Sequence, residues 1–101
     1  MYVRMITYHL MTDVGKQKVS NAYDEIVTFL GKQNGFQGSA LLFDEEAQTA
    51  ILLTYWSDDE CAGNAGETLL PILFERSPEL SEQPPEITGY HVLDLRLSVD
   101  K

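Results

Sequence analysis

Residues 36–56 read FQGSALLFDEEAQTAILLTYW. Two stretches rich in aromatic, leucine and β-branched residues, 36–43 and 49–56, flank the short acidic segment 44–48. Such a connection has the usual length of a β-hairpin loop. Apolar side chains occupy odd and even positions in both stretches, and alternate residues of a strand point to opposite faces of a sheet. The segment therefore predicts a hairpin whose strands, above all 49–56, are buried on both faces.

The chain before the hairpin predicts a strand and then a helix. Residues 2–10 are rich in Tyr, Val, Ile and Thr, contain no Gly or Pro, and are apolar on both parities, as expected for a buried strand. After a turn over residues 11–15, apolar residues recur at steps of three and four up to Leu30, which predicts an amphipathic helix. Thr12 or Asp13 is a suitable N-cap, and Gly31 is a suitable end.

The chain after the hairpin begins with a capping box, Ser57-Asp58-Asp59-Glu60, in which Ser57 is the expected N-cap of a second helix. Glycines disfavour a helix interior, and Pro71 fits best in a first helical turn. We therefore expect two helical pieces, about residues 58–65 and 67–75.

The C-terminal part predicts a linker and a last strand. Residues 76–85 contain Pro78, Pro84 and Pro85, which favour extended or turn backbone. Residues 86–97 are rich in apolar side chains and predict the fourth strand. We expect residues 98–101 to form a frayed tail.

The order strand–helix–strand–strand–helix–strand predicts an α+β fold, the ferredoxin-like βαββαβ arrangement, as one domain over residues 1–101. Right-handed crossovers place both helices on one face of a four-stranded antiparallel sheet. The strands are apolar on their other face too, and no segment remains to cover it. A second copy is the simplest cover, so we expect a homodimer packed sheet face to sheet face, a dimeric α/β barrel.

Composition narrows the classes of partner. The chain has 101 residues, 44% of them hydrophobic and 23% charged, which is typical of a globular domain. Seven basic against sixteen acidic residues give a net charge of -9 at pH 7, which disfavours nucleic acid and anionic membrane surfaces. The single cysteine, Cys61, cannot form an internal disulfide, and no signal peptide or apolar span is evident. A cytoplasmic protein is expected.

Five short motifs resemble a known family, the antibiotic biosynthesis monooxygenase (ABM) domain. They are Gly35-Phe36-Gln37-Gly38, Leu41-Leu42-Phe43-Asp44, Leu52-Leu53-Thr54-Tyr55-Trp56-Ser57, Pro84-Pro85-Glu86 and Tyr90-His91-Val92. The resemblance covers about residues 1–95 and implies the dimeric α/β-barrel fold. The family includes cofactor-free monooxygenases of polycyclic aromatic substrates and haem-degrading enzymes. The haem-degrading members need an axial His in the second helix, which residues 64–70 lack, so no cofactor is expected.

The resemblance implies two main functions. In the first, the protein is a cofactor-independent monooxygenase that acts on a small apolar, aromatic or quinone-like molecule in a pocket between sheet and helices, where the substrate carbanion supplies electrons to O₂. In the second, the same scaffold is a non-catalytic ligand-binding or stress-response dimer. A purely structural dimer is a third alternative. Convergence of polar side chains in the pocket separates the first from the others.

The candidate catalytic residues are Tyr8, His9 and Asn64. Tyr8 or His9 would move a proton, and Asn64 would orient an oxygen atom. Tyr8 and His9 point to opposite faces, so one should meet the helices and the other the dimer interface. Antiparallel pairing of the first and last strands is expected to gather them near Tyr90 and His91. Which histidine faces the pocket is left open.

The candidate substrate-binding residues are Trp56, Tyr23 and Phe74, with Trp56 stacking on an aromatic ring. Each has a plain alternative as a core side chain. The corresponding alternatives for His9 and Asn64 are an interface histidine and a helix break.

Other chemistry finds little support in the sequence. No Cys, Asp or Glu stands at ligand spacing to the two histidines, so no metal site is expected. The acids around Cys61 oppose thiolate formation, which makes a catalytic thiol unattractive. Arg4 and Arg96 are expected to form surface or interface ion pairs. No phosphate-binding loop, dinucleotide fingerprint or hydrolase motif occurs.

Overall fold

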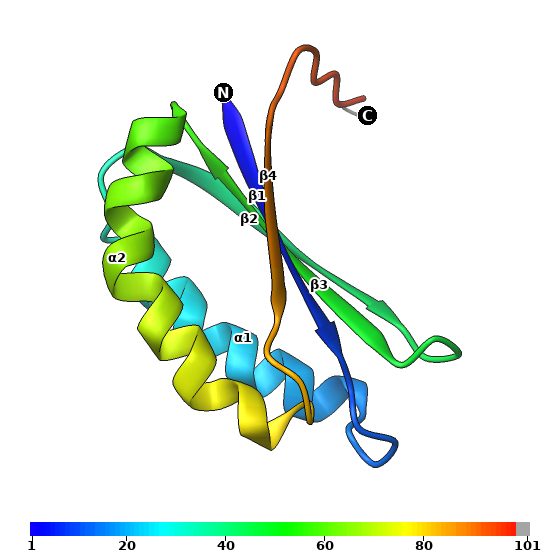
Figure 1. Cartoon of the computed structure of the whole chain (residues 1–101). Coiled ribbons are helices and arrows are strands. Elements are labelled where there is room, and N and C mark those ends of the chain that lie inside the picture. Colours follow the sequence, from blue (N-terminus) through cyan, green and yellow to red (C-terminus); the bar gives the residue numbers. More distant parts are fainter. Residues whose placement is uncertain (99–101) are drawn as a thin grey trace.

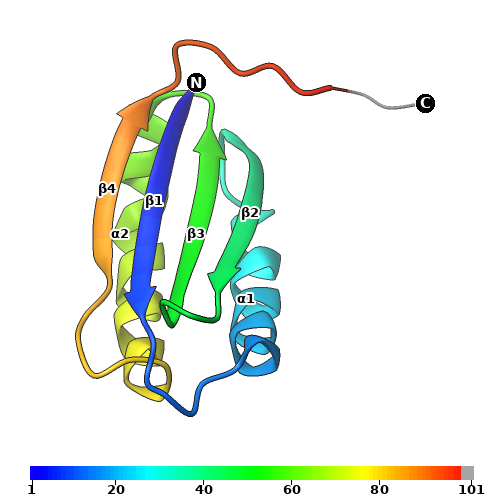
Figure 2. The ribbon, with the colours of Figure 1, turned by 90° about the vertical axis from the view of Figure 1, so that its right-hand side faces the viewer.

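The computed structural model describes residues 1–98 and shows the expected ferredoxin-like arrangement (Figure 1). Its elements are β1 (Tyr2–His9), α1 (Lys16–Leu30), β2 (Phe36–Asp44), β3 (Thr49–Trp56), α2 (Asp59–Arg76), the short 3₁₀ helix η1 (Ser77–Glu79) and β4 (Glu86–His91). The strands form one antiparallel sheet in the order β2-β3-β1-β4. Both helices lie against the same side of this sheet, and Figure 2 views the opposite side.

The two faces of the sheet differ in burial. On the face covered by the helices, Ile6 and Trp56 are fully buried, and Leu52 is 2% exposed. On the other face, Leu53 is half-buried and Tyr90 is 54% exposed. We call this surface the open face; its larger apolar residues are Val3, Met5, Leu42, Ile51, Leu53, Tyr55 and Tyr90. The prediction of strands apolar on both faces, with helices on only one, is confirmed.

The second helix is continuous, and the prediction of two helical pieces is wrong. Its inward residues, Ala62, Ala65, Gly66, Leu69 and Leu73, are buried along the whole length. This contact with the sheet outweighs the low helix propensity of the glycines. Pro71 lies on the exposed side, where water can satisfy the carbonyl group of Glu67 that lacks its usual donor.

The N-caps of both helices differ from the predicted ones. Asp58, not Ser57, caps α2, and its Oδ1 accepts a hydrogen bond of 2.8 Å from the backbone N–H of Cys61. This hydrogen bond lowers the pKa of the Asp58 carboxyl group. The first helix starts at Lys16 after Gly15, without any side-chain cap, because Met11–Val14 forms a separate turn. The predicted end at Gly31 is confirmed.

The fourth strand ends at His91, six residues before the predicted end. Its partner is β1, and Tyr2 pairs with His91 at the start of that strand. A last hydrogen bond joins the Val92 N–H to the Met1 carbonyl. Residues 92–98 instead run away from the sheet (Figure 2). Of the predicted frayed tail, only Ser98 belongs to the described residues.

Candidate functional site

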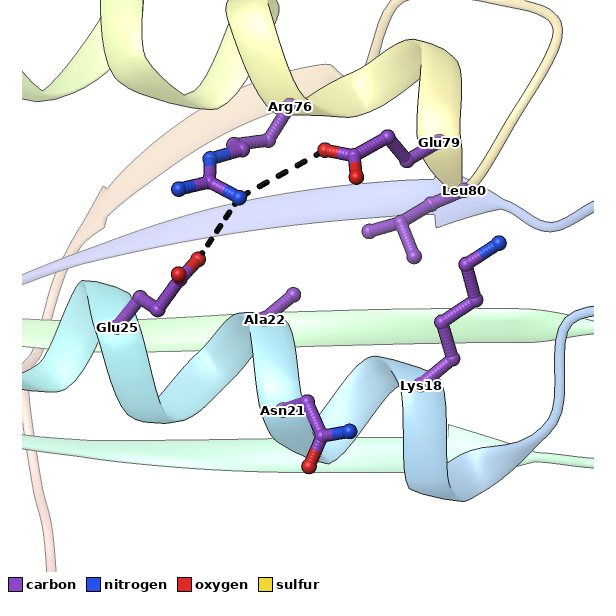
Figure 3. A pocket seen from close by; sticks show the side chains of 7 residues that line it. All are labelled: Lys18, Asn21, Ala22, Glu25, Arg76, Glu79 and Leu80. Carbon is purple, nitrogen blue, oxygen red and sulfur yellow. Dashed lines mark ion pairs between the residues drawn. The ribbon is translucent and has the colours of Figure 1, made fainter.

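A groove lies between α1 and the end of α2 (Figure 3). Its volume is about 180 Å³. It is lined by Lys18, Asn21, Ala22, Glu25, Arg76, Glu79 and Leu80. Arg76 Nη1 lies 3.0 Å from Glu25 Oε2 and 3.7 Å from Glu79 Oε2. One guanidinium group therefore joins the two helices across the groove.

A small apolar cavity adjoins this groove between α1 and the sheet. It is lined by Tyr8, Val19, Ala22, Tyr23, Ile26, Leu41, Ala50, Leu52, Arg76 and Leu80. Its volume of about 20 Å³ is enough for a single water molecule. Ala22, Arg76 and Leu80 line both spaces. We call the groove and the cavity together the interhelical site.

Two tyrosines, Tyr8 and Tyr23, are among the residues that line this apolar cavity. Tyr8 is 6% exposed, and burial raises its pKa to about 12. The Tyr8 phenol is therefore neutral near pH 7, where it can donate a hydrogen bond but does not act as a base. Tyr23 Oη lies 2.6 Å from Ser39 Oγ and so connects α1 to β2.

Of the candidate substrate-binding residues, only Tyr23 lines the interhelical site. Trp56 is fully buried; its Nε1 donates a hydrogen bond of 2.8 Å to Thr54 Oγ1. Its ring packs edge to face against Phe36, with 5.4 Å between ring centroids. Phe74 is 44% exposed on α2. The geometry of Trp56 is that of a core side chain with its polar atom satisfied.

The candidate Asn64 lies on the exposed side of α2. It does not face the sheet, because its neighbours Ala62 and Ala65 occupy the buried stripe of the helix. A residue between these two positions along the helix points away from the sheet. Asn64 therefore does not lie with Tyr8 in the interhelical site.

The two histidines lie on opposite faces of the sheet. Tyr8 points to the helices and His9 to the open face, which confirms their predicted alternation; the Nε2 of His9 lies 3.3 Å from Glu86 Oε1. His91 is paired with Tyr2, and their rings meet edge to face with centroids 5.2 Å apart. The predicted cluster of Tyr8 and His9 with the end of β4 is therefore wrong: antiparallel register places His91 at the beginning of β1, whereas β1 ends near Glu86.

Arg4 departs from its predicted role. Its Nη1 is buried and has no hydrogen-bond partner within residues 1–98. Arg96, by contrast, forms the predicted surface ion pair, with Nη2 at 3.1 Å from Asp94 Oδ2. Arg4 shares strand parity with Tyr8, so the sequence already placed it on the same face; only the packing of α2 reveals that this face encloses it.

Glu25 and Arg76 line the interhelical site but are not among the residues predicted from the sequence. Glu25 belongs to the polar side of the first helix, and Arg76 was assigned to a linker. Their ion pair forms between residues 51 positions apart, and no local pattern marks such a contact. Within the described chain, no group of three or more His, Cys, Asp and Glu residues is arranged to hold a metal ion. Neither helix of residues 1–98 is long and apolar enough to cross a membrane.

Comparison of the sequence with protein-family models and with curated proteins finds no match. Comparison of the structure finds close similarity of fold. SnoaB from Streptomyces nogalater, a cofactor-independent oxygenase, superposes with a TM-score of 0.75 at 14% identity, over 93% of this chain and 94% of that one. A protein of unknown function from Nitrosomonas europaea gives a TM-score of 0.78 at 11% identity, over 98% and 95% of the two chains.

A third similar structure contains a bound ligand. The monooxygenase from the gene ActVA-Orf6 of Streptomyces coelicolor, in complex with nanaomycin D, has a TM-score of 0.73 at 13% identity, over 97% of this chain and 92% of that one. The element order and the sheet topology agree with this similarity. The chain thus has the ferredoxin-like fold of the antibiotic biosynthesis monooxygenases.

Proposed function

We propose that this protein binds a small aromatic or quinone-like molecule at the interhelical site and oxygenates it without a cofactor. The observation that supports this most is the burial of the Tyr8 phenol beside an apolar cavity, in a fold shared with SnoaB and the ActVA-Orf6 monooxygenase. An apolar site with few polar atoms suits such a ligand.

The proposed reaction needs no external reductant. A substrate with an acidic CH₂ group beside an aromatic ketone loses a proton and becomes a carbanion. The carbanion passes electrons to O₂ and forms a C–O bond. Loss of water then leaves a carbonyl group. In total, CH₂ and O₂ become C=O and H₂O, so one oxygen atom enters the product and the other leaves as water.

Tyr8 is the residue of this chain that we assign to the reaction. Its neutral phenol donates a hydrogen bond to the substrate oxygen that gains negative charge as the proton leaves. The apolar lining strengthens this hydrogen bond, because water is excluded. Tyr23 orients the ring of the ligand from α1. His9 and Asn64, the other candidate catalytic residues, point away from the cavity, so they have no role in this scheme.

Ligand binding requires the interhelical site to open. Pockets for small molecules usually measure about 300–1,000 Å³, whereas the groove measures about 180 Å³ and the cavity about 20 Å³. The ion pair between Arg76 and Glu25 spans the opening. We expect α1 and the end of α2 to separate when a ligand enters.

Binding without turnover is the second candidate function. It is favoured by the lining of the inner cavity, which includes no histidine and no carboxylate. Glu25 and Glu79 line the outer groove, but both contact Arg76. A substrate of ordinary acidity would therefore find no base, and only a substrate that ionises readily would react.

The protein works as a homodimer in this proposal. The open face presents exposed apolar side chains, Leu42 and Tyr90 among them, and burying them contributes about 25 cal/mol per Å². Pairing two open faces would also hold the sheet rigid beneath the interhelical site.

Mass spectrometry of the products tests the reaction. Anthrone, with its acidic CH₂ group, would be incubated with the protein under ¹⁸O₂. The proposal predicts anthraquinone with one ¹⁸O atom, formed faster than without protein, and a rate about 10²-fold lower in Tyr8→Phe. Tight binding of anthrone without acceleration would establish the non-catalytic alternative, and absence of binding would exclude both functions.

A further inference from the structure

Arg4 carries a charge for which the described chain supplies no partner. It lies on the helix-covered face of β1 beneath α2, and its Nη1 is buried without an acceptor. None of the ion pairs within residues 1–98 includes it. Because a guanidinium group stays charged in proteins, such burial opposes folding. The donors of Arg4 Nη1 are therefore unused within the described chain.

Two glycines make room for the polar groups at this place. A Cβ atom on Gly66 of α2 would overlap Arg4 Nη1, and one on Gly89 of β4 would overlap Tyr2 Oη. Glycine weakens both a helix and a strand interior. The chain thus accepts two destabilising residues where the head groups of Arg4 and Tyr2 lie.

Tyr2 and His91 lie near Arg4, along the line where β4 faces α2; we call this region the seam. In the ladder of β1 with β4, Arg4 pairs with Gly89 and Tyr2 with His91, so Tyr2 and Arg4 share one face. The Nε2 of His91 lies 4.0 Å from Asp59 Oδ2 at the start of α2. Asp59 thus stands beside His91, and Arg4 is left without a carboxylate.

We propose that this seam binds the carboxylate group of a small organic ligand, with Arg4 as the charged donor and Tyr2 as a second donor. A planar guanidinium matches the two oxygen atoms of a carboxylate. Arg4 and Tyr2 are half-buried and His91 is exposed, so solvent reaches part of the seam, while Arg4 Nη1 itself lies beneath α2. The net charge of -9 disfavours general attraction of anions, which makes any affinity local. This site does not depend on the proposed oxygenation.

Acetate is the simplest probe, and acetamide is its neutral counterpart. In an NMR titration of the ¹⁵N-labelled protein, acetate should shift the backbone amide signals of Gly66 and Gly89 and saturate, while acetamide at equal concentration should not. The Arg4→Met variant should bind acetate at least about tenfold more weakly. Equal shifts with both probes, or unchanged acetate affinity in Arg4→Met, would overturn the proposal.

Matched glycine variants provide a second test. Gly66→Ala places a methyl group where Arg4 Nη1 lies and should weaken acetate binding. Gly63→Ala lies one turn earlier on the same helix, and its new Cβ meets no atom within 4 Å, so acetate binding should not change. If the two variants bound acetate with the same affinity, the proposed role of Arg4 Nη1 beside Gly66 would be wrong.

Thermal unfolding distinguishes a ligand site from a structural arginine. Without a ligand, Arg4→Met should melt at the same temperature as the parent protein or higher, because a charged group with a buried donor that lacks an acceptor is removed. Acetate should raise the melting temperature of the parent only. A lower melting temperature of Arg4→Met without a ligand would show that Arg4 supports the fold. Acetate binding is measured without anthrone, so a negative result for one ligand does not decide the proposal for the other.

Discussion

The two faces of the sheet have nearly the same chemistry but different surroundings. Leu52 and Leu53 are adjacent in β3, yet Leu52 is 2% exposed beneath the helices and Leu53 is half-buried on the open face. Each covered residue packs against a helix of its own chain, whereas the open face has no cover within residues 1–98. The hydrophobicity of a strand thus indicates that both of its faces are buried, but it does not indicate which part of the same chain or of another chain covers each face.

The largest expected effect comes from truncating the covered face. Leu52→Ala removes a side chain from the packed core and should lower the free energy of unfolding by about 2–5 kcal/mol. Leu53→Ala is the matched control, and its cost should be smaller and should grow with protein concentration if a second copy covers it. Urea unfolding at two concentrations measures both. Equal, concentration-independent losses would mean that the two faces are energetically alike.

Alkaline pH should weaken the covered face through Tyr8. Its pKa is raised from 10.0 to about 12 in the folded protein, so stability is complete below pH 10 and falls as the pH rises from 10 towards 12. The slope from this residue is about 1.4 kcal/mol per pH unit. Tyr8→Phe removes this contribution. Unfolding of both proteins at pH 8 and pH 11 measures the difference, and parallel pH curves would argue against it.

A charge on the open face should separate two copies. If two open faces pair, Leu53→Asp places a carboxylate in the apolar interface, which should weaken association at least about tenfold. The helical content of the monomer should remain, because Leu53 contacts no helix. Sedimentation equilibrium gives the masses, and circular dichroism checks the fold. A parent protein that sediments as a monomer at micromolar concentration would exclude the proposed dimer.

The smallest effect is expected at the interhelical ion pair. Glu25→Gln removes an exposed partner of Arg76, so the free energy of unfolding should change by less than about 1 kcal/mol. Ligand entry should become faster, because the pair that joins the helices across the groove is weakened. Glu79→Gln is the control. Glu79 lies 3.7 Å from Arg76, but it is only three residues further along the chain, so this ion pair does not join α2 to α1. Stopped-flow fluorescence with anthrone would reveal equal entry rates if the pair has no such role.

Local sequence patterns were sufficient for most of the fold. Residues 49–56 form β3 with the predicted bounds, and the first helix ends at Gly31 as expected. The predicted cluster of Tyr8 with His91 failed because antiparallel direction was inferred without the register. Register is set by long-range pairing and decides which residues meet at a strand end.

The candidate site was less predictable than the fold. Tyr8 and Tyr23 line the interhelical site, but Trp56, the leading substrate-binding candidate, is enclosed in the core. A tryptophan at a strand end has the same sequence signal in either setting. Arg4 gave no signal of its burial, because a charged residue in a strand is usually exposed.

The sequence by itself determined the order of strands and helices, the alternation of strand residues between two faces and the apolar character of both faces, since these follow from periodicity and local propensity. Only the tertiary structure decided that α2 passes unbroken through Pro71, that β4 ends where β1 begins, and that Arg4 Nη1 is buried beside Gly66. These features arise from contacts between residues distant in the chain, and packing energy at such contacts exceeds the local preferences that sequence patterns express.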